Sequence, residues 1–379
     1  MTNVTFFIGT VKLGGTEAKL VRNFLPALKK RRILNPRLLL LRNEGEFMDL
    51  IPDDIETFSL DEGKRTKLPR LVLRLRRMLG KLDSEVIMSC MSYPALISYG
   101  ARKLSPGAFT HVIHDTVPMR EFIKYEISGE RLRRLKLSLI RRAYADADAL
   151  IGNSQGVTDN FLEFGMETER VHMIYNPLNR DMIAGMAEEE AGLNIEGPLV
   201  VSAGRLVYQK AFDVLIRAFR KVRDRTPAKL LIIGDGHLKR ELLSMRESLG
   251  LRDDILFSGF QQNPWKYFKH ATVFCLASRY EGFPNVVLEA MTLGVPVVVT
   301  DCHAGPSEIT KGGRYGILVP PENPDALAGA LLSVITSKRL RGNLSALALE
   351  RSRAFGFETS LSAYERLLAN RGAPDGSIR

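Results

Sequence analysis

Short apolar segments of strand character alternate with amphipathic helical segments along this chain, and the alternation runs twice. The first series extends from a strand at residues 4–9 to a strand at 171–175, and the second begins with a strand at 199–203. Strands that alternate with helices predict parallel sheets covered by helices on both faces. We therefore expect an α/β protein made of two Rossmann-like domains.

The break between the two series predicts the domain boundaries. Asn176-Pro177 ends the first series, and residues 177–197 form a polar connection that includes Glu188-Glu189-Glu190. We expect an N-terminal domain over residues 1–176, a linker over 177–197 and a C-terminal domain over 198–355. Residues 356–379 are expected to form a last helix and a tail. The length of 379 residues fits two or three domains of ~150 residues each.

Composition narrows the class of protein. No apolar run approaches the ~18 residues that a membrane-spanning helix needs. Cys90, Cys275 and Cys302 form no C-x-x-C pair, and the N-terminus enters a strand without a basic start, so we expect a cytoplasmic protein with free thiols. The formal net charge of +11 fits three kinds of partner: nucleic acid, an anionic membrane or a phosphate-rich small molecule.

The stretch Leu276–Gly294, LASRYEGFPNVVLEAMTLG, carries the clearest signal for chemistry. It reads as a strand end, a loop and a helix that starts near Asn285 or Val286. Glu281 in the loop and Glu289 on the helix are eight residues apart, a spacing that suits two contacts on one ligand. The backbone N–H groups at the start of the helix are a ready site for an anion.

In this context the two carboxylates resemble the E-x7-E signature of retaining, nucleotide-sugar-dependent glycosyltransferases of family 4. The resemblance rests on S-R-Y-E-G-F-P-N-V-V-L-E-A-M after an apolar strand, and it is strong over most of residues 198–335. It implies the GT-B fold, in which two Rossmann-like domains face each other across a cleft and the C-terminal helix returns to the N-terminal domain.

The resemblance also implies roles for the residues of this stretch. Glu289 would bind the ribose hydroxyls, and Glu281 would contact the donor sugar and stabilise positive charge at the reacting carbon. Retention in this family is explained by attack from the same face, with the departing phosphate oxygen taking the proton of the acceptor, so no dedicated base is assigned. Backbone amides would hold the sugar hydroxyls and the phosphate, and they belong to Gly282, Phe283, Asn285 and Val286.

A second motif supplies fixed positive charge for the diphosphate leaving group. Gly204-Arg205-Leu206 ends a strand and Lys210 precedes a helix, so both cations lie at the carboxyl end of a sheet. The segment resembles the family's diphosphate clamp, and no metal ion is then expected. The resemblance further implies that Gly234, after the next strand, and Phe260, after the one beyond it, lie at the nucleoside.

The N-terminal half contributes two further candidates. Gly14-Gly15 lies between a strand and a helix; alone it favours a tight turn, but in family 4 a G-G-x-E here places backbone next to the donor diphosphate. His114 ends the strand at residues 110–114, where the family has a histidine that faces the donor sugar. We expect this half to hold the acceptor site, and its weaker resemblance leaves the acceptor undetermined.

Two basic stretches, residues 64–81 and 131–142, mix Lys and Arg with leucines. Two interpretations stay open: the stretches dock on an anionic membrane, or their leucines pack on the sheet while the charges face water. Because aromatic residues are not interleaved with the charges, we expect no nucleic acid. Asp146-x-Asp148 is not expected to bind metal, since it precedes its strand and so lies opposite the ligand edge.

These features predict a retaining glycosyltransferase that moves a hexose or an N-acetylhexosamine from a nucleotide diphosphate sugar, expected to be UDP-linked. The acceptor is expected to be a glycan or a polyprenyl-linked glycan, because Thr300–Ile309 resembles a form common in enzymes of bacterial surface glycans. The protein would work in the cytoplasm, and at the inner face of the cell membrane under the interpretation in which the basic stretches dock there. Two alternatives are a nucleotide-sugar epimerase with the same fold and a binding scaffold without chemistry.

Overall fold

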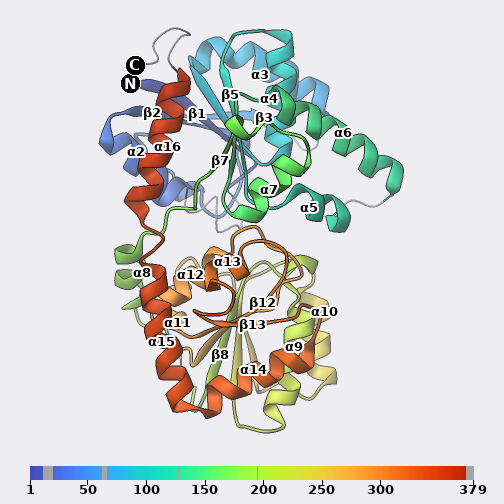
Figure 1. Cartoon of the computed structure of the whole chain (residues 1–379), viewed down its shortest axis with the longest axis vertical. Helices are drawn as coiled ribbons and strands as arrows, with labels where there is room; N and C mark the ends of the chain where they lie inside the picture. Colours follow the sequence, from blue (N-terminus) through green and yellow to red (C-terminus); the bar gives the residue numbers. More distant parts are fainter. Residues whose placement is uncertain (12–19, 62–65, 127–128, 194, 373–379) are drawn as a thin grey trace. The chain divides into compact units, whose positions relative to one another are not determined.

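The computed structural model describes residues 1–379 apart from residues 12–19, 62–65, 127–128, 194 and 373–379. The chain divides into two compact units, Met1–Pro177 with Glu358–Arg379 (unit 1) and Leu178–Phe357 (unit 2). Each unit is built on one parallel sheet with helices on both faces (Figure 1). The predicted α/β class with two parallel sheets is confirmed.

Unit 1 holds a seven-stranded sheet with the order β3-β2-β1-β4-β5-β6-β7. Because β1 is covered on both faces, its side chains are buried from Val4 to Ile8, and the sequence reads as a continuous apolar run rather than an alternating one. The strands are β1 (Thr2–Ile8), β2 (Leu34–Arg42), β3 (Thr57–Asp61), β4 (Val86–Cys90), β5 (Thr110–Asp115), β6 (Ala149–Gly152) and β7 (Val171–Met173).

The helices of unit 1 bury their apolar stripes on this sheet. Leu71 and Leu75 of α3 pack with Phe7, Leu39 and Ile97, while Tyr144 and Phe161 belong to a second cluster around β5 and β6. The side chain of Ser154 accepts a hydrogen bond from the Val157 N–H and so caps the N-terminus of α7. The elements are η1 (Leu20–Phe24), α2 (Leu25–Arg31), η2 (Met48–Leu50), α3 (Leu68–Leu82), α4 (Ser92–Leu104), α5 (Met119–Glu126), α6 (Glu130–Asp146), α7 (Gln155–Glu163) and η3 (Thr168–Arg170).

The last helix, α16 (Phe357–Gly372), packs beside α2 and the start of the chain (Figure 1). Arg31 forms ion pairs with Glu365, which is buried, and with Glu358 at 3.4 Å. The ring of Phe24 meets the ring of Tyr364 edge to face, with 4.9 Å between centroids. The expected return of the C-terminal helix to the N-terminal part is therefore confirmed.

Unit 2 holds a six-stranded sheet with the order β10-β9-β8-β11-β12-β13. Its core is formed by the buried stripe of α9, which includes Leu215, Phe219 and Val222, packed on β8 and β9. The strands are β8 (Leu199–Ala203), β9 (Lys229–Ile233), β10 (Ile255–Gly259), β11 (Val273–Leu276), β12 (Val297–Thr300) and β13 (Ile317–Val319). The helices are η4 (Tyr208–Lys210), α9 (Phe212–Arg223), α10 (Lys239–Ser248), α11 (Trp265–Phe268), α12 (Asn285–Thr292), α13 (Pro306–Thr310), α14 (Pro324–Thr336) and α15 (Lys338–Ser352).

The segment expected as a linker contains a helix, α8 (Arg180–Ala187), that packs as part of unit 2. Ile183 and Ala187 are buried, and the Asn263 side-chain amide donates to the Met186 carbonyl at 2.7 Å.

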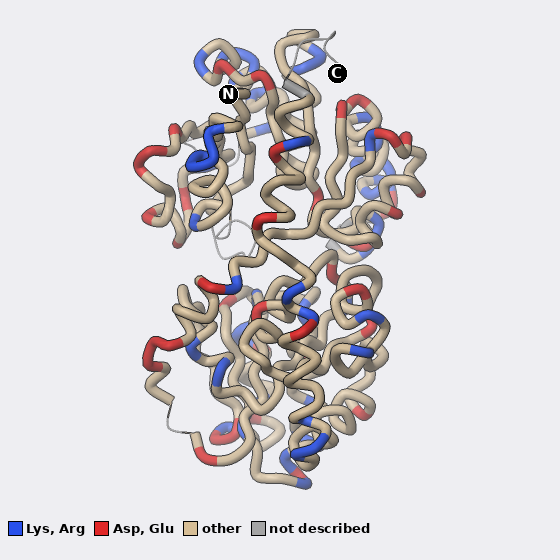
Figure 2. The backbone as a smooth tube through the Cα atoms, turned by 60° about the vertical axis from the view of Figure 1, so that its left-hand side comes forward, with Lys and Arg blue, Asp and Glu red and all other residues tan. Residues whose placement is uncertain are grey.

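Lys and Arg are spread along the whole backbone and interspersed with Asp and Glu (Figure 2). No helix among the described residues combines the length and the apolar run that crossing a membrane requires.

Candidate active site

The order of the strands in unit 2 reverses at β8, which has β9 on one side and β11 on the other. The loops that leave the carboxyl ends of β8 and β11 therefore start next to each other and turn in opposite directions. Open α/β sheets bind ligands in the crevice between two such loops. Arg205 and Lys210 follow β8, and Glu281 follows β11. The sheet thus brings together Lys210 and Glu281, which are 71 residues apart in sequence.

Lys210 and Glu281 form an ion pair with 2.5 Å between Nζ and Oε1. The side chain of Glu281 is 6% exposed and that of Lys210 is 15% exposed, so the pair is mostly shielded from water. The hydroxyl of Ser278 donates to the same carboxylate oxygen at 2.6 Å. Oε2 of Glu281 accepts no hydrogen bond from the residues that the structure describes, which leaves one oxygen of this oriented carboxylate for a ligand.

Hydrogen bonds between the two loops hold this ion pair in place. The amide of Arg279 donates to the Gln209 carbonyl at 2.8 Å, and the Gln209 side chain donates back to the Tyr280 carbonyl at 3.1 Å. The guanidinium of Arg279 pairs with Asp213 at 2.8 Å and stacks over the ring of Tyr208. Neither Ser278 nor Arg279 was predicted as a site residue; the partners of Arg279 come from a distant segment, whereas Ser278 contacts Glu281 three residues further on.

Arg205 differs from Lys210 in its surroundings. Its side chain is exposed and makes no ion pair or hydrogen bond within the described part of the chain. Directly after Lys210, the buried Ala211 adopts a left-handed conformation with φ of 49° and ψ of 40°. Such strain in a residue other than glycine persists only where its surroundings impose it, and it is found at ligand sites.

Helix α12 begins at Asn285, as expected, and its N-cap residue, Pro284, makes no side-chain hydrogen bond to the first turn. Asn285 and Val286 are half-buried, so the amides of the first turn lie near the surface, whereas Gly282 and Phe283 are buried. The ring of Phe283 packs on the ring of Phe355, with 5.6 Å between centroids. Gly305 donates from its amide to the Gly282 carbonyl at 2.9 Å, and a Cβ at Gly305 would collide with that carbonyl oxygen.

Glu289 lies one turn after Asn285 on the same face of α12 and is buried. The indole N–H of Trp265 donates to its Oε2 at 2.9 Å. A buried carboxylate needs such donors to stay in place. Trp265 therefore orients Glu289 in the structure.

The candidates for the nucleoside follow β9 and β10. Gly234 has φ of 138°, its amide donates to the Gly259 carbonyl at 2.8 Å, and a Cβ here would collide with the Gly204 carbonyl. Glycine at position 234 is thus required by the approach of two loops, with or without a ligand. Phe260 directly follows β10 and is half-buried.

His114 and Asp115 end β5 in unit 1, and both are buried. The Tyr364 hydroxyl lies 3.3 Å from Nε2 of His114, and burial lowers the pKa of His114 to about 4, so the imidazole is neutral at pH 7. Asp115 accepts a hydrogen bond from the hydroxyl of Tyr144, and burial raises the pKa of this carboxyl to about 7. Gly14 and Gly15 lie outside the described residues.

Asp146 and Asp148 precede β6, at the amino end of the strands, and form ion pairs there. Arg102 pairs with Asp148 at 2.8 Å, Lys103 pairs with Asp146, and the carboxylate of Asp148 accepts from the His111 amide at 2.7 Å. Within the described ranges, no cluster of three His, Cys, Asp or Glu side chains is arranged to hold a metal ion.

Comparison with known proteins adds family information to this geometry. Residues 187–351 match the model for "Glycosyl transferases group 1", and residues 18–181 match the model for "Glycosyltransferase Family 4". The two matches meet where the structure divides into its two units.

One curated relative matches over nearly its whole length. It is the N-acetylgalactosamine-N,N'-diacetylbacillosaminyl-diphospho-undecaprenol 4-alpha-N-acetylgalactosaminyltransferase of Campylobacter jejuni, 27% identical over 359 residues that cover 94% of this chain and 96% of the relative. A second, the lipopolysaccharide 1,6-galactosyltransferase of Salmonella typhimurium, is 28% identical over 51% of this chain and 54% of the relative.

Among solved structures, HepE of Anabaena in complex with UDP and glucose superimposes with a TM-score of 0.81. The sequences are 20% identical, and the match covers 97% of this chain and 100% of HepE. At this identity the likeness establishes the fold. WaaG, a glycosyltransferase involved in lipopolysaccharide biosynthesis, superimposes with a TM-score of 0.75 at 16% identity, covering 96% of this chain and 99% of WaaG.

Proposed function

The chain belongs to glycosyltransferase family 4, the retaining enzymes with the GT-B fold, and we propose that it moves a hexose or an N-acetylhexosamine from a UDP-sugar to a glycan or a polyprenyl-linked glycan. The product would enter surface polysaccharide or oligosaccharide biosynthesis. The single observation that carries this proposal is the shielded ion pair of Lys210 and Glu281 at the switch point of unit 2, beside the exposed Arg205.

For the donor diphosphate, the proposal assigns Arg205, Lys210 and the backbone of Gly14 and Gly15. Lys210 has three donor protons, of which one is used by Glu281, so its ammonium group can also reach a phosphate oxygen. The guanidinium of Arg205 offers a planar fork for two phosphate oxygens. These groups and the N-terminus of α12 supply the positive charge that a metal ion would otherwise give, so the reaction is proposed to be metal-independent.

For the sugar and the nucleoside, the proposal uses the two glutamates. Glu281 contacts the donor sugar and stabilises positive charge at the reacting carbon, and Glu289, oriented by Trp265, binds the ribose hydroxyls. His114 is proposed to position the donor sugar as a neutral imidazole. Further contacts are assigned to the amides of Gly282, Phe283, Asn285 and Val286 at the sugar, and to Gly234 and Phe260 at the nucleoside.

The acceptor side of the proposal rests on the relatives. The Campylobacter jejuni enzyme, which matches almost end to end, is named for an acceptor on diphospho-undecaprenol, and HepE binds UDP and glucose. We assign acceptor binding to residues 1–176 and donor binding to residues 198–355. A polyprenyl-linked acceptor resides in a bilayer, so we propose peripheral contact with the inner face of the cell membrane through residues 64–81 and 131–142.

The test of donor choice is a thermal-shift screen against UDP, GDP, ADP and their sugars. A ligand at 100 times its Kd adds ~2.7 kcal/mol of stability. We expect UDP and one UDP-sugar to raise the melting temperature, and a response to GDP or ADP alone would overturn the assignment of UDP. Arg205→Gln should abolish the shift, whereas Arg225→Gln, the same charge change at another exposed arginine of unit 2, should keep it.

Product analysis separates transfer from the alternatives. With donor alone, an epimerase would yield a new UDP-sugar, and a scaffold would yield no product. We expect release of UDP and a sugar that keeps its anomeric configuration, and transfer to polyprenyl-linked glycans when these are added. Activity that persists in the presence of EDTA is expected, and its loss with EDTA would contradict the metal-independent reaction.

A further inference from the structure

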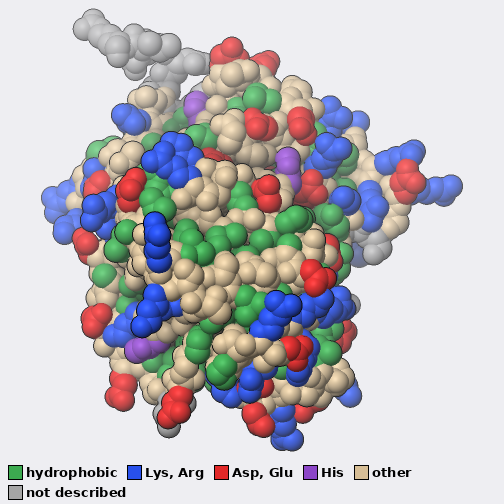
Figure 3. Space-filling model, turned by 60° about the horizontal axis from the view of Figure 1, so that its bottom comes forward, with side chains coloured by type: hydrophobic (Ala, Val, Ile, Leu, Met, Phe, Trp, Pro, Cys, Tyr) green, Lys and Arg blue, Asp and Glu red, His purple; other side chains and the backbone are tan. Residues whose placement is uncertain are grey.

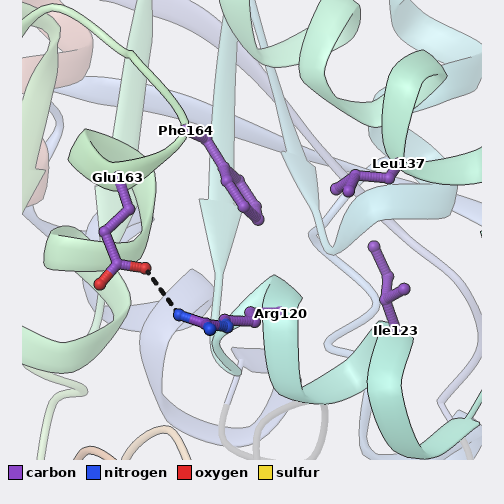
Figure 4. A pocket seen from close by; sticks show the side chains of 5 residues that line it. All are labelled: Arg120, Ile123, Leu137, Glu163 and Phe164. Atoms are coloured by element: carbon purple, nitrogen blue, oxygen red, sulfur yellow. Dashed lines mark ion pairs between the residues drawn. The ribbon is translucent and has the colours of Figure 1, made fainter. Parts of the chain in front are cut away.

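Many ion pairs in the described part of the chain lie at the surface. Arg120 and Glu163 are one example, with 3.8 Å between Nη1 and Oε2, and Figure 4 shows this pair at the border of a hollow of about 440 Å³ in unit 1. Both side chains are more than half exposed, so water screens their attraction and the pair adds little stability. Figure 3 shows Lys and Arg interspersed with Asp and Glu over the face that it presents.

Arg279 differs because its side chain is 9% exposed and contacts three segments of unit 2. Nη2 donates to Asp213 at 2.8 Å, Nη1 donates to the Tyr208 carbonyl at 2.7 Å, and Nε donates to Glu322. Cζ lies 4.0 Å from the centroid of the Tyr208 ring. We refer to these contacts as the Arg279 clamp. Since every nitrogen of the guanidinium is engaged and two carboxylates neutralise its charge, Arg279 is poorly suited to bind the donor diphosphate itself.

The Arg279 clamp joins three connections at the carboxyl edge of the sheet. Tyr208 and Asp213 follow β8, Arg279 itself follows β11, and Glu322 lies between β13 and α14. In the order β8-β11-β12-β13, the strand before Arg279 is next to β8 and two places from β13. Glu322 has φ of 57°, a strained value for a residue other than glycine that persists where the surroundings impose it. Arg279 therefore ties the switch point of unit 2 to the loop after its last strand.

The clamp lies on either side of the ion pair at the candidate active site. Arg279 is two residues before Glu281, while Tyr208 is two residues before Lys210 and Asp213 is three residues after it. Lys210 and Glu281 meet at 2.5 Å only if the segments after β8 and β11 stay in register. A misplacement of about 1 Å between reacting groups can cost about 100-fold in rate. Contacts that fix this register therefore bear on the reaction without touching the substrate.

We propose that Arg279 is a positioning residue for the ion pair of Lys210 and Glu281. It clamps the segment after β8 to the segment after β11, so that the ammonium and the carboxylate meet in the geometry that transfer requires. A guanidinium is needed for this, because lysine would offer a single point charge in place of a planar fork and a face that stacks on an aromatic ring. The inference rests on the proposed function for its kinetic consequences, whereas the clamp itself can be measured without substrate.

The kinetic test compares Arg279→Lys with the native chain. We expect kcat to fall about 100-fold, the loss that a misplacement of about 1 Å can cause. The Kd for UDP should change by less than about threefold, since Arg205 and Glu289 remain for the nucleotide. In the background of Glu281→Gln, Arg279→Lys should cost little further residual activity, because residues that act as a unit give effects that do not add. An unchanged kcat, or a full additional loss in that background, would overturn the positioning role.

The substrate-free test measures how fast Lys210 is acylated by a dilute amine-reactive ester, with mass spectrometry of the labelled peptide as the readout. In the native chain Lys210 is paired with Glu281 and its side chain is 15% exposed, so we expect slow acylation. Arg279→Gln should raise the rate several-fold, because loss of the clamp lets the pair open locally. Arg279→Lys serves for labelling as well if Arg279→Gln lowers the melting temperature below that of the assay.

The matched control is Arg217→Gln. Arg217 lies one turn after Asp213 on α9, pairs with the same carboxylate at 3.8 Å and is more than half exposed. The control removes a cation from Asp213 but leaves the Arg279 clamp in place, so we expect the acylation rate of Lys210 and kcat to stay as in the native chain.

The two tests separate this inference from the proposed function. If the native chain turned over no nucleotide sugar, the proposed function would fail, and the acylation rate would still decide whether Arg279 holds the pair. A rate that is the same in Arg279→Gln and in the native chain would contradict the clamp, as would an equal rise in Arg217→Gln. Trp265 fluorescence on heating shows whether unit 2 of each variant is folded at the temperature of the assay.

Discussion

The hydroxyl of Tyr364 lies 3.3 Å from Nε2 of His114, a residue 250 positions earlier in the chain. Tyr364 belongs to α16, which is anchored to the start of the chain through Arg31 and Glu365. The C-terminal helix therefore completes the surroundings of the candidate histidine at the end of β5. Loss of this helix would remove a polar partner of His114 as well as an apolar contact of Phe24.

Tyr364→Phe tests whether this contact positions His114. The change removes one hydrogen bond, so we expect a loss of about 1 kcal/mol in the free energy of unfolding. If His114 acts on the donor sugar, kcat should fall more than the KM for the donor changes, and the His114 ring signals should shift in NMR spectra. Tyr93→Phe, at an exposed tyrosine of unit 1, is the control. Unchanged kcat with shifted His114 signals would assign His114 a structural role.

A double-mutant cycle tests the ion pair of Lys210 and Glu281. Lys210→Met or Glu281→Gln alone leaves an uncompensated charge in a shielded site, and we expect each to cost about 3 kcal/mol of stability. The double variant should lose less stability than the two single variants lose in sum. All three variants should lose nearly all transfer activity. The single tryptophan, Trp265, lies in unit 2, so its fluorescence follows the unfolding of that unit. Additive losses, within about 0.5 kcal/mol, would show that the pair is uncoupled.

Trp265→Phe removes the indole donor from Glu289 while keeping an aromatic ring. Leaving an oxygen of a buried carboxylate without its partner costs about 1–3 kcal/mol. We expect the binding of UDP to weaken by about tenfold, since Glu289 is assigned to the ribose. The binding of pyrophosphate, which lacks the nucleoside, should weaken less. Isothermal titration calorimetry with UDP and with pyrophosphate measures both. Equal weakening of the two ligands would contradict the assignment of Glu289 to the ribose.

Asp115 predicts a pH dependence of stability in unit 1. Burial raises the pKa of this carboxyl from 3.8 to about 7, so between these values the folded state binds more protons than the unfolded state. Its contribution is therefore present in full below pH 4 and is lost as the pH rises towards 7. Asp115→Asn should remove this loss, so its stability relative to the native chain should increase from pH 4 to pH 7 and stay constant above.

The measurement for Asp115→Asn is the urea midpoint by circular dichroism, with Trp265 fluorescence as the reference for unit 2. Burial lowers the pKa of His111 and of His114 below the ordinary value of 6.5, so the folded state loses stability as the pH falls below 6.5. This loss is the same in the native chain and in Asp115→Asn, so it cancels in the difference between their stabilities. A difference that does not change between pH 4 and pH 7 would show that Asp115 is ionised when folded. Tyr144→Phe, which removes its hydrogen-bond donor, should raise the pKa of Asp115 further.

Local patterns in the sequence were sufficient for much of the fold and for part of the site. The alternation of strands and helices predicted both parallel sheets, because hydrophobic periodicity reflects which faces each element buries. The start of α12 at Asn285 was also predictable, since a helix start depends on neighbouring residues. The helix α8 was missed because its short apolar stripe, with Ile183, lies within a polar stretch.

The sequence by itself determined the family, the two sheets and the residue types available at the strand ends. Only the tertiary structure decided which of them meet: Lys210 with Glu281, Trp265 with Glu289, and Tyr364 with His114. It also decided that α3 buries most of its leucines while α6 exposes Leu132 and Leu135, although the two stretches read alike. The physical reason is that helical periodicity specifies a helix and its apolar stripe, whereas exposure depends on whether another part of the chain covers that stripe.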